Sequence, residues 1–334
     1  MNEYGGLEVL WFCVIAGLWA GYFFLEGFDF GVGMLLRWVG RDRAQRRAVI
    51  HTIGPVWDGN EVWLIVAAGA TFAAFPEWYA TLFSGYYLLL FVVVVGLVLR
   101  PVALELWGKG GDRWRSGWEW ALFAGSVLPA FVWGVVFANV VRGVPINGDM
   151  EFTGSVADLL GPYALLGGLT TLLLCATHGA VFLGLRTEGD VHARACTAAR
   201  WLAAASAVAV VAFVCWTLGE HAEPASVVAS VGACALASAV PALLRRGAGW
   251  AFAANGLAIA LLFALLFADL FPNVLVSSTD PAFDLTTGNA ASGSYTLTVI
   301  TVVAAIMVPA VIVCQAWTYR VFRARVGSEQ FEGA

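Results

Sequence analysis

Charged residues are scarce in this sequence of 334 residues: only 12% are charged, whereas 60% are hydrophobic. A soluble globular domain carries about 25% charged residues. The mean hydropathy of +0.80 points the same way. The composition therefore excludes an ordinary soluble protein, and we expect an all-α integral membrane protein.

Cysteine and histidine patterns that indicate a metal or haem centre are also missing. The six cysteines are scattered without a Cys-x-x-Cys pair, so no metal or disulfide framework can be argued from their spacing. Of the four histidines, His178 falls inside an apolar run. A lone buried histidine is more often packed or hydrogen-bonded than a haem ligand. No basic residue precedes Arg37, so we expect no cleavable signal peptide.

Long apolar runs dominate the chain instead. Nine of them reach the roughly 20 residues that a membrane-spanning helix needs. The loops between them are short, so residues 1–334 are expected to form a single polytopic membrane domain. We expect spans near residues 7–30, 55–75, 80–99, 120–141, 160–185, 199–218, 225–243, 250–271 and 296–318.

Basic residues alternate between the two sides of the predicted membrane domain. Of the 18 Lys and Arg residues, 17 fall in every second loop or in the C-terminal tail, and Arg142 lies opposite. Cytoplasmic loops carry an excess of basic residues. This pattern predicts an N-terminus outside and a C-terminus in the cytoplasm, and an odd number of spans requires the same arrangement.

Two carboxylates open the second predicted span, in Trp57-Asp58-Gly59-Asn60-Glu61. An ionisable residue inside a spanning helix costs about 3 kcal/mol, so it usually faces protein and has a function there. Asp58 follows Arg47 by 11 residues, which is about 16 Å along an unbroken helix. Glu61 shares its face. We favour a buried functional pair over the alternative, two helix-start residues outside the membrane.

Two further charged pairs deserve a functional hypothesis. Glu26 and Asp29 are spaced i, i+3 near the cytoplasmic end of the first span, and a solvated helix end is the alternative. Glu105 and Lys109 are spaced i, i+4 beyond the third predicted span, and an ordinary surface pair is the alternative. Lys109, Glu105 and Asp58 would form a line of titratable groups suited to a proton relay.

Several short segments from the first span to the last carry a family resemblance. They are residues 27–35, 57–64, 100–102, 114–120, 143–145, 271–272, 277–279 and 296–299. Through them the chain resembles the second subunit of the cytochrome bd quinol oxidase family. The Trp-Asp-Gly-Asn segment at 57–60 is the most specific of them.

The resemblance implies an oxidase that takes electrons from quinol, with menaquinol as the expected species, and reduces dioxygen to water. It implies a fold of two four-helix bundles plus one additional helix, in an obligate heterodimer with subunit I. Two haems b and one haem d are then ligated by that partner. We also expect small single-span accessory subunits, lipids and a structural quinone to associate with the complex, and we expect no nucleic acid. The expected location is the bacterial plasma membrane.

The resemblance also implies roles for individual residues of this chain. Asp58, Glu105 and Lys109 match positions that line a proton route from the cytoplasm. Trp63 looks like the mouth of a lateral oxygen channel. Further candidates beside them are Asp29, Glu61 and Trp57.

Two other hypotheses remain open on the sequence alone. One is a proton-coupled transporter that uses intramembrane carboxylates, namely Asp29, Asp58, Glu61 and Asp269, as its ion sites. The other is a purely structural partner that only stabilises a haem-bearing subunit.

Overall fold

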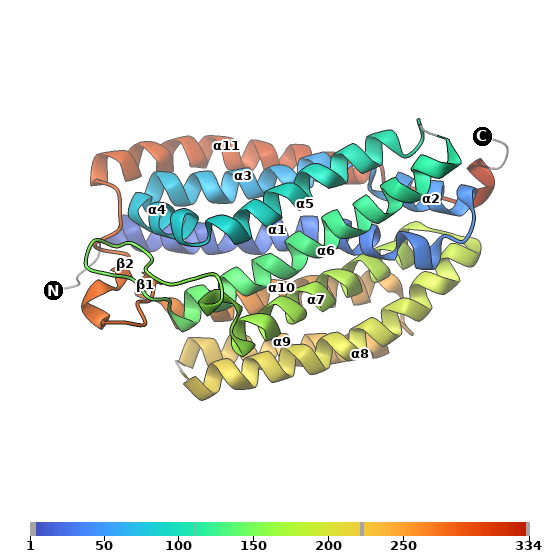
Figure 1. The fold of residues 1–334 in the computed structure, drawn as a ribbon. Helices are drawn as coiled ribbons and strands as arrows, with labels where there is room; N and C mark the ends of the chain where they lie inside the picture. The colour runs from blue at the N-terminus through green and yellow to red at the C-terminus, as the bar shows by residue number, and fades with distance from the viewer. Residues whose placement is uncertain (1–4, 110, 221–223, 332–334) are drawn as a thin grey trace.

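The computed structural model describes residues 5–109, 111–220 and 224–331, and these are almost entirely helical. Long helices run side by side along one axis of the molecule (Figure 1). The helices are α1 (Gly6–Val39), α2 (Arg43–Ile53), α3 (Trp57–Ala74), α4 (Pro76–Gly85), α5 (Tyr87–Leu106), α6 (Asp112–Arg142), α7 (Pro162–Arg186), α8 (Gly189–Glu220), α9 (Pro224–Leu243), α10 (Ala248–Leu270) and α11 (Ser294–Val321). The short elements are strands β1 (Asn273–Leu275) and β2 (Leu285–Thr286) and the 3-10 turns η1 (Asp158–Leu160), η2 (Pro281–Phe283) and η3 (Ser328–Phe331).

Eight helices in the described part of the chain are long and apolar enough to cross a membrane, which confirms the all-helical membrane fold. They are α1 and α5 to α11. The second predicted span corresponds to α3, which is outside this set because Asp58, Asn60 and Glu61 make its first turns polar. The ninth span stays a prediction.

The structure corrects the limits of the third predicted span, which is wrong at both ends. Residues 80–99 are divided between α4, which ends at Gly85, and α5, which continues to Leu106. Arg100 and Glu105 therefore lie within a helix and not in the following loop. Helices α1, α6 and α8 also extend about two turns beyond their predicted spans, at the end of the molecule where basic residues gather.

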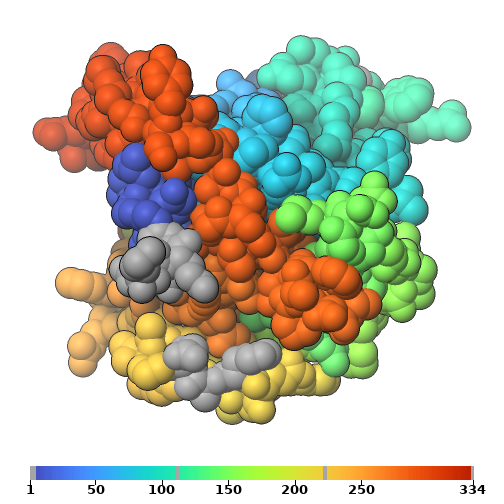
Figure 2. Space-filling view, turned by 90° about the vertical axis from the view of Figure 1, so that its left-hand side faces the viewer, coloured from blue at the N-terminus to red at the C-terminus, as the bar shows by residue number. Residues whose placement is uncertain are grey.

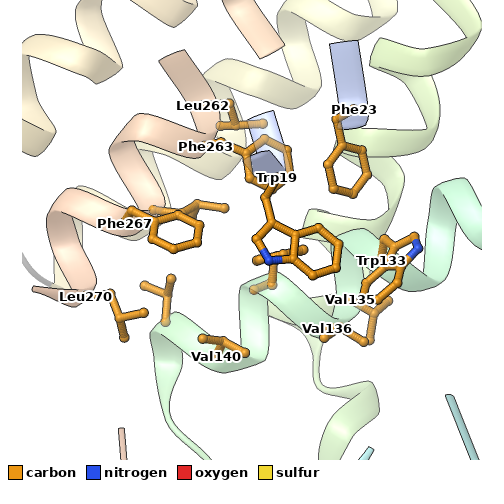
Figure 3. Close-up of a cluster of buried hydrophobic side chains, with 14 of the residues drawn as sticks. Trp19, Phe23, Trp133, Val135, Val136, Val140, Leu262, Phe263, Phe267 and Leu270 are labelled. Carbon is orange, nitrogen blue, oxygen red and sulfur yellow. The ribbon is translucent and has the colours of Figure 1, made fainter. Parts of the chain in front are cut away.

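Helix α1 lies at the centre of the fold. It contacts α3, α6, α7 and α10, while α7 to α10 pack on one another in a closed ring of four helices. Helix α5 packs on α6, and α11 contacts α3 and α1 from outside. An aromatic cluster fills the space between α1, α6 and α10: the rings of Trp19 and Trp133 are 4.8 Å apart, and Phe23 stacks on Phe263 at 4.4 Å (Figure 3).

Glycines allow α1 to approach α7 most closely. A Cβ atom on Gly31 would lie 2.1 Å from the Cys175 carbonyl oxygen, and one on Gly179 would lie 2.3 Å from the Gly31 carbonyl carbon. Small residues at such crossings let helix backbones pack directly. This contact fixes the depth and rotation of α1, and with them the position of its two carboxylates.

The two ends of the molecule differ. The turn η3, helix α2 and the turn between α7 and α8 lie at one end, and the start of α1 lies at the other beside β1 and β2 (Figure 1). Figure 2 views this second end, where the orange segment around the two strands lies between α1 in blue and the green loop before α7. Most of the basic residues belong to the first end, as the charge pattern predicts.

Candidate functional site

Asn60 is the centre of a buried polar network near the start of α3. Its Nδ2 donates a hydrogen bond of 2.7 Å to Asp29 Oδ2 on α1. Its Oδ1 accepts from Gln315 Nε2 at 2.7 Å and from the Tyr319 hydroxyl at 2.8 Å, both on α11. The amide thus uses its donor and its acceptor ends at once. Asn60 joins three helices and holds the Asp29 carboxylate in place.

A buried ion pair lies one turn before Asp29 on α1. Glu26 Oε1 is paired with Arg100 Nη1 of α5, and both side chains are 0% exposed. The guanidinium also lies over the Phe30 ring, 4.8 Å from its centroid. Glu26 and Asp29 are both fully buried, so the solvated helix end considered for them is wrong. Removing one member of such a pair leaves an uncompensated buried charge.

Asp58 and Glu61 have a different environment. Helix α2 ends at Ile53, and α3 begins only at Trp57, so the chain between them is not one unbroken helix. Pro55 lacks the backbone N–H that would continue the hydrogen-bond ladder. Asp58 therefore lies in the first turn of α3 with an exposed side chain, and Glu61 is partly buried. The local geometry is that of the helix-start alternative, and the expected burial of Asp58 is not found within this chain.

The two tryptophans of the same segment face opposite parts of the molecule. Trp57 packs against a cluster of buried apolar side chains that includes Val56 and Ile53. Trp63 packs over α1, where a Cβ on Gly21 would lie 3.0 Å from its ring. Trp63 also lines an apolar groove of about 550 Å³ between α1, α10 and α11.

Glu105 and Lys109 form the surface pair that was the alternative to a proton-entry role. Lys109 Nζ lies 3.3 Å from Glu105 Oε2, and the two side chains are 68% and 66% exposed. They border a hollow of about 500 Å³ that His51 also lines. Burial lowers the pKa of His51, and the positive charges of Arg47 and Arg186 lower it further.

The structure adds a fourth charged site, which the sequence did not reveal. Glu119 of α6 is 1% exposed and is paired with Arg37 at 3.0 Å and with Arg46 at 2.9 Å. Trp107 Nε1 donates to the same carboxylate at 3.3 Å. Because α6 was expected to start near residue 120, Glu119 was counted as a loop residue. Its contacts tie α1, α2 and α6 together.

His178 has a structural environment and does not fit a haem. It is 0% exposed, its ring stacks on Phe252 at 4.2 Å, and its Nε2 lies 3.1 Å from the Phe24 carbonyl oxygen. Its Nε2, one of the two nitrogens that could ligate a haem iron, is already used in the contact with the Phe24 carbonyl oxygen. Within the described residues, no group of three or more His, Cys, Asp or Glu side chains is placed to hold a metal ion.

Comparison with known proteins identifies the family. The sequence profile of cytochrome bd terminal oxidase subunit II matches residues 7–322. The chain belongs to this family. It is 44% identical to cytochrome bd ubiquinol oxidase subunit 2 of Bacillus subtilis (strain 168) over 334 residues, covering 97% of this chain and 98% of that protein. It is 35% identical to cytochrome bd-I ubiquinol oxidase subunit 2 of Escherichia coli (strain K12), covering 99% and 98%.

A solved structure agrees on the fold. A chain from the structure of bd oxidase from Geobacillus thermodenitrificans superposes with a TM-score of 0.76, covering 95% of this chain and 99% of that one at 18% identity. The resemblance found in the sequence is therefore confirmed at the level of the family. The chain is a multi-pass bacterial membrane protein and a subunit of a respiratory oxidase, which argues against the transporter hypothesis.

Proposed function

We propose that this chain pairs with a haem-bearing subunit I to form a quinol oxidase that reduces dioxygen to water. The partner would ligate two haems b and one haem d, and menaquinol is the expected electron donor. The family assignment supports this proposal, and so does the packed environment of His178. Small accessory subunits and a structural quinone stay predictions.

The proposed topology has nine spans in two four-helix bundles plus one additional helix, with the N-terminus outside. Helix α3 would be the ninth span: its 18 residues extend about 27 Å, close to the hydrocarbon thickness of about 30 Å. The position of the start of α1 and of η3 at opposite ends supports an odd number of spans (Figure 1).

The exposed carboxylate of Asp58 on α3 is the observation that carries the proposal. Asp58 lies in the first turn of α3, at the cytoplasmic end of the proposed span, where its carboxylate can contact both water and a partner subunit. The same face of α3 exposes large apolar side chains, and so do α5 and α11, as the core of a protein interface requires. We therefore assign the surface around Asp58 to contact with subunit I. Its apolar members include Val62, Ile65, Phe91, Val98, Val302 and Ile306.

The proton route would run along this contact. Protons enter at Lys109 and Glu105, which are open to water, and move inward to Asp58 at the start of α3. Each electron that arrives at a buried centre needs a compensating proton, because uncompensated charge in a dry interior is costly. Glu61 and Asp29 are the next acids inward, and Trp57 flanks the route.

The oxygen path is a separate part of the proposal. Trp63 is partly exposed on α3, and an apolar ring at the entrance of a path suits dioxygen, which has no charge or hydrogen-bonding group. Protons and oxygen would thus reach the partner by different faces of α3.

The test is the oxygen consumption of the purified complex with Asp58→Asn. We expect the complex to assemble with its full haem content and to turn over at least tenfold more slowly. Glu77→Gln is the matched control, because Glu77 is another exposed carboxylate in a first helical turn, that of α4. Normal turnover of the Asp58→Asn complex would contradict the proton-route assignment.

A further inference from the structure

A pocket of about 380 Å³ opens at the basic end of the molecule, between the ends of α7, α10 and α11. Apolar side chains, among them Phe182 and Phe252, form much of its wall. Three arginines also line it, Arg186, Arg323 and Arg325. Among the residues that the structure describes, no carboxylate belongs to the lining. Within residues 5–109, 111–220 and 224–331, none of these arginines is ion-paired with an acid.

The chain holds these arginines at the pocket by backbone pairing. Arg186, in the last turn of α7, donates from its guanidinium to the Phe322 carbonyl oxygen. The Val326 N–H donates to the Arg186 carbonyl at 2.8 Å, and the Val326 carbonyl accepts from Glu188 N–H at 3.2 Å. The segment after α11 is therefore fixed to the end of α7.

An apolar groove continues from the pocket along the axis of the molecule. Phe252 and Tyr319 line both the pocket and the groove of about 550 Å³ that runs between α1, α10 and α11. Along α1 the groove extends from Phe28 to Gly17, which is about 16 Å for 11 helical residues. Half of a hydrocarbon core of about 30 Å has the same length. The groove therefore has the reach of an acyl chain in one leaflet.

We propose that the pocket and the groove together bind one anionic phospholipid of the cytoplasmic leaflet. The phosphate would lie among Arg186, Arg323 and Arg325, and an acyl chain would occupy the groove beside Tyr319. Basic pockets between spanning helices on the cytoplasmic side bind anionic headgroups. A neutral amphiphile such as a quinone would leave three unpaired arginines beside its head. A zwitterionic lipid would bring its own ammonium group to a pocket that is already positive.

The test is native mass spectrometry of the purified complex, stripped of lipid with detergent and titrated with phosphatidylglycerol or phosphatidylethanolamine. The pocket variant is Arg323→Gln/Arg325→Gln; Arg186 stays unchanged because it also bonds the backbone. The control is Arg245→Gln/Arg246→Gln, which removes two exposed arginines from the turn between α9 and α10, outside the pocket. Since each basic residue near an anionic headgroup contributes on the order of 1 kcal/mol, the pocket variant should bind phosphatidylglycerol at least tenfold more weakly.

Wild type and control should retain one phosphatidylglycerol in preference to phosphatidylethanolamine. Equal weakening in the control would overturn the proposal, because the effect would then be general surface charge. Equal retention of phosphatidylethanolamine would also overturn it. If glycerol 3-phosphate displaced the lipid with the affinity of the whole lipid, the site would bind a phosphate group only, and the lipid proposal would be wrong. Ala316→Phe, which fills the groove on α11, should weaken lipid binding, and no effect would refute the acyl-chain part.

Discussion

Two pairs of carboxylates in this chain have the same spacing and opposite environments. Glu26 and Asp29 on α1 are 0% exposed, while Asp58 is exposed and Glu61 partly buried on α3. The difference comes from the neighbours of each helix. Helix α1 is surrounded by α3, α6, α7 and α10, whereas α3 lies at the edge with α1, α4 and α11 against it. An i, i+3 pair of acids therefore indicates a shared face, and the packing around the helix decides what covers it.

The two pairs also differ in their partners. Each acid of the interior pair has a partner: Arg100 is ion-paired with Glu26, and the Asn60 amide donates a hydrogen bond to Asp29. Within the described part of the chain, Asp29 Oδ1 and Glu61 Oε2 are each buried without a hydrogen-bond partner, so the two pairs differ in Arg100 and Asn60 on one side and in the exposure of Asp58 on the other. Paired interior charges fix the helices relative to one another. Asp58 on α3 is exposed, so its carboxylate can exchange protons with its surroundings. We therefore expect the interior pair to govern stability and the α3 pair to govern turnover.

Breaking the interior pair should have the largest effect on stability. Glu26→Gln leaves the Arg100 guanidinium buried and charged, since arginine does not deprotonate in proteins. We expect the free energy of unfolding to fall by about 3–5 kcal/mol. The measurement is the thermal denaturation of the purified complex, together with its yield. Glu26→Gln/Arg100→Met should recover most of the loss, and an equally unstable double variant would contradict the pairing argument.

Removing the Asn60 amide should have an intermediate effect. Asn60→Leu deprives the Asp29 carboxylate of its donor and leaves Gln315 and Tyr319 without their acceptor. Leaving a buried polar group unsatisfied costs about 1–3 kcal/mol. Tyr319→Phe removes only one hydrogen bond and should cost about 1 kcal/mol. Both losses of stability are measured from the midpoint of thermal denaturation. If Tyr319→Phe destabilised the protein as much as Asn60→Leu, Asn60 would not be the centre of the polar network.

The exposed pair at the end of α5 should matter least for stability. Glu105→Gln breaks a 3.3 Å contact between two largely exposed side chains, and such pairs contribute about 0.2–1 kcal/mol. The denaturation midpoint should hardly change. Oxygen consumption should fall, but by less than with Asp58→Asn, because water can replace an acid at an open entrance. Unchanged turnover in both variants would favour a purely structural role for this subunit.

The all-helical membrane fold and the family were accessible from the sequence, because the apolar runs and the motif at 57–60 are local signals. The ends of the helices could not be predicted where polar residues lie inside a helix. Arg100 and Glu119 look like loop residues in a hydropathy profile, and their burial depends on partners far along the chain. A profile that reads one segment at a time cannot detect a partner on another helix.

The polar network was hidden for the same reason. Asn60 is 255 residues from Gln315 and 259 from Tyr319, and only the packing of α11 on α3 brings them together. Their spacing of i, i+4 in an apolar helix was the available signal, since it puts an amide and a phenol on one face. The depth estimate for Asp58 assumes a helix through Pro55, whereas α2 ends at Ile53 and α3 begins at Trp57.

Proton uptake by the Asp58→Asn complex tests the functional role of the α3 acids most directly. The reduced complex is mixed with oxygen in weakly buffered solution, and a pH-indicating dye follows the protons taken up. We predict that uptake slows by at least tenfold together with oxygen reduction, while the Glu77→Gln complex behaves as wild type. Proton uptake at the normal rate in Asp58→Asn complex with full haem content would contradict the account.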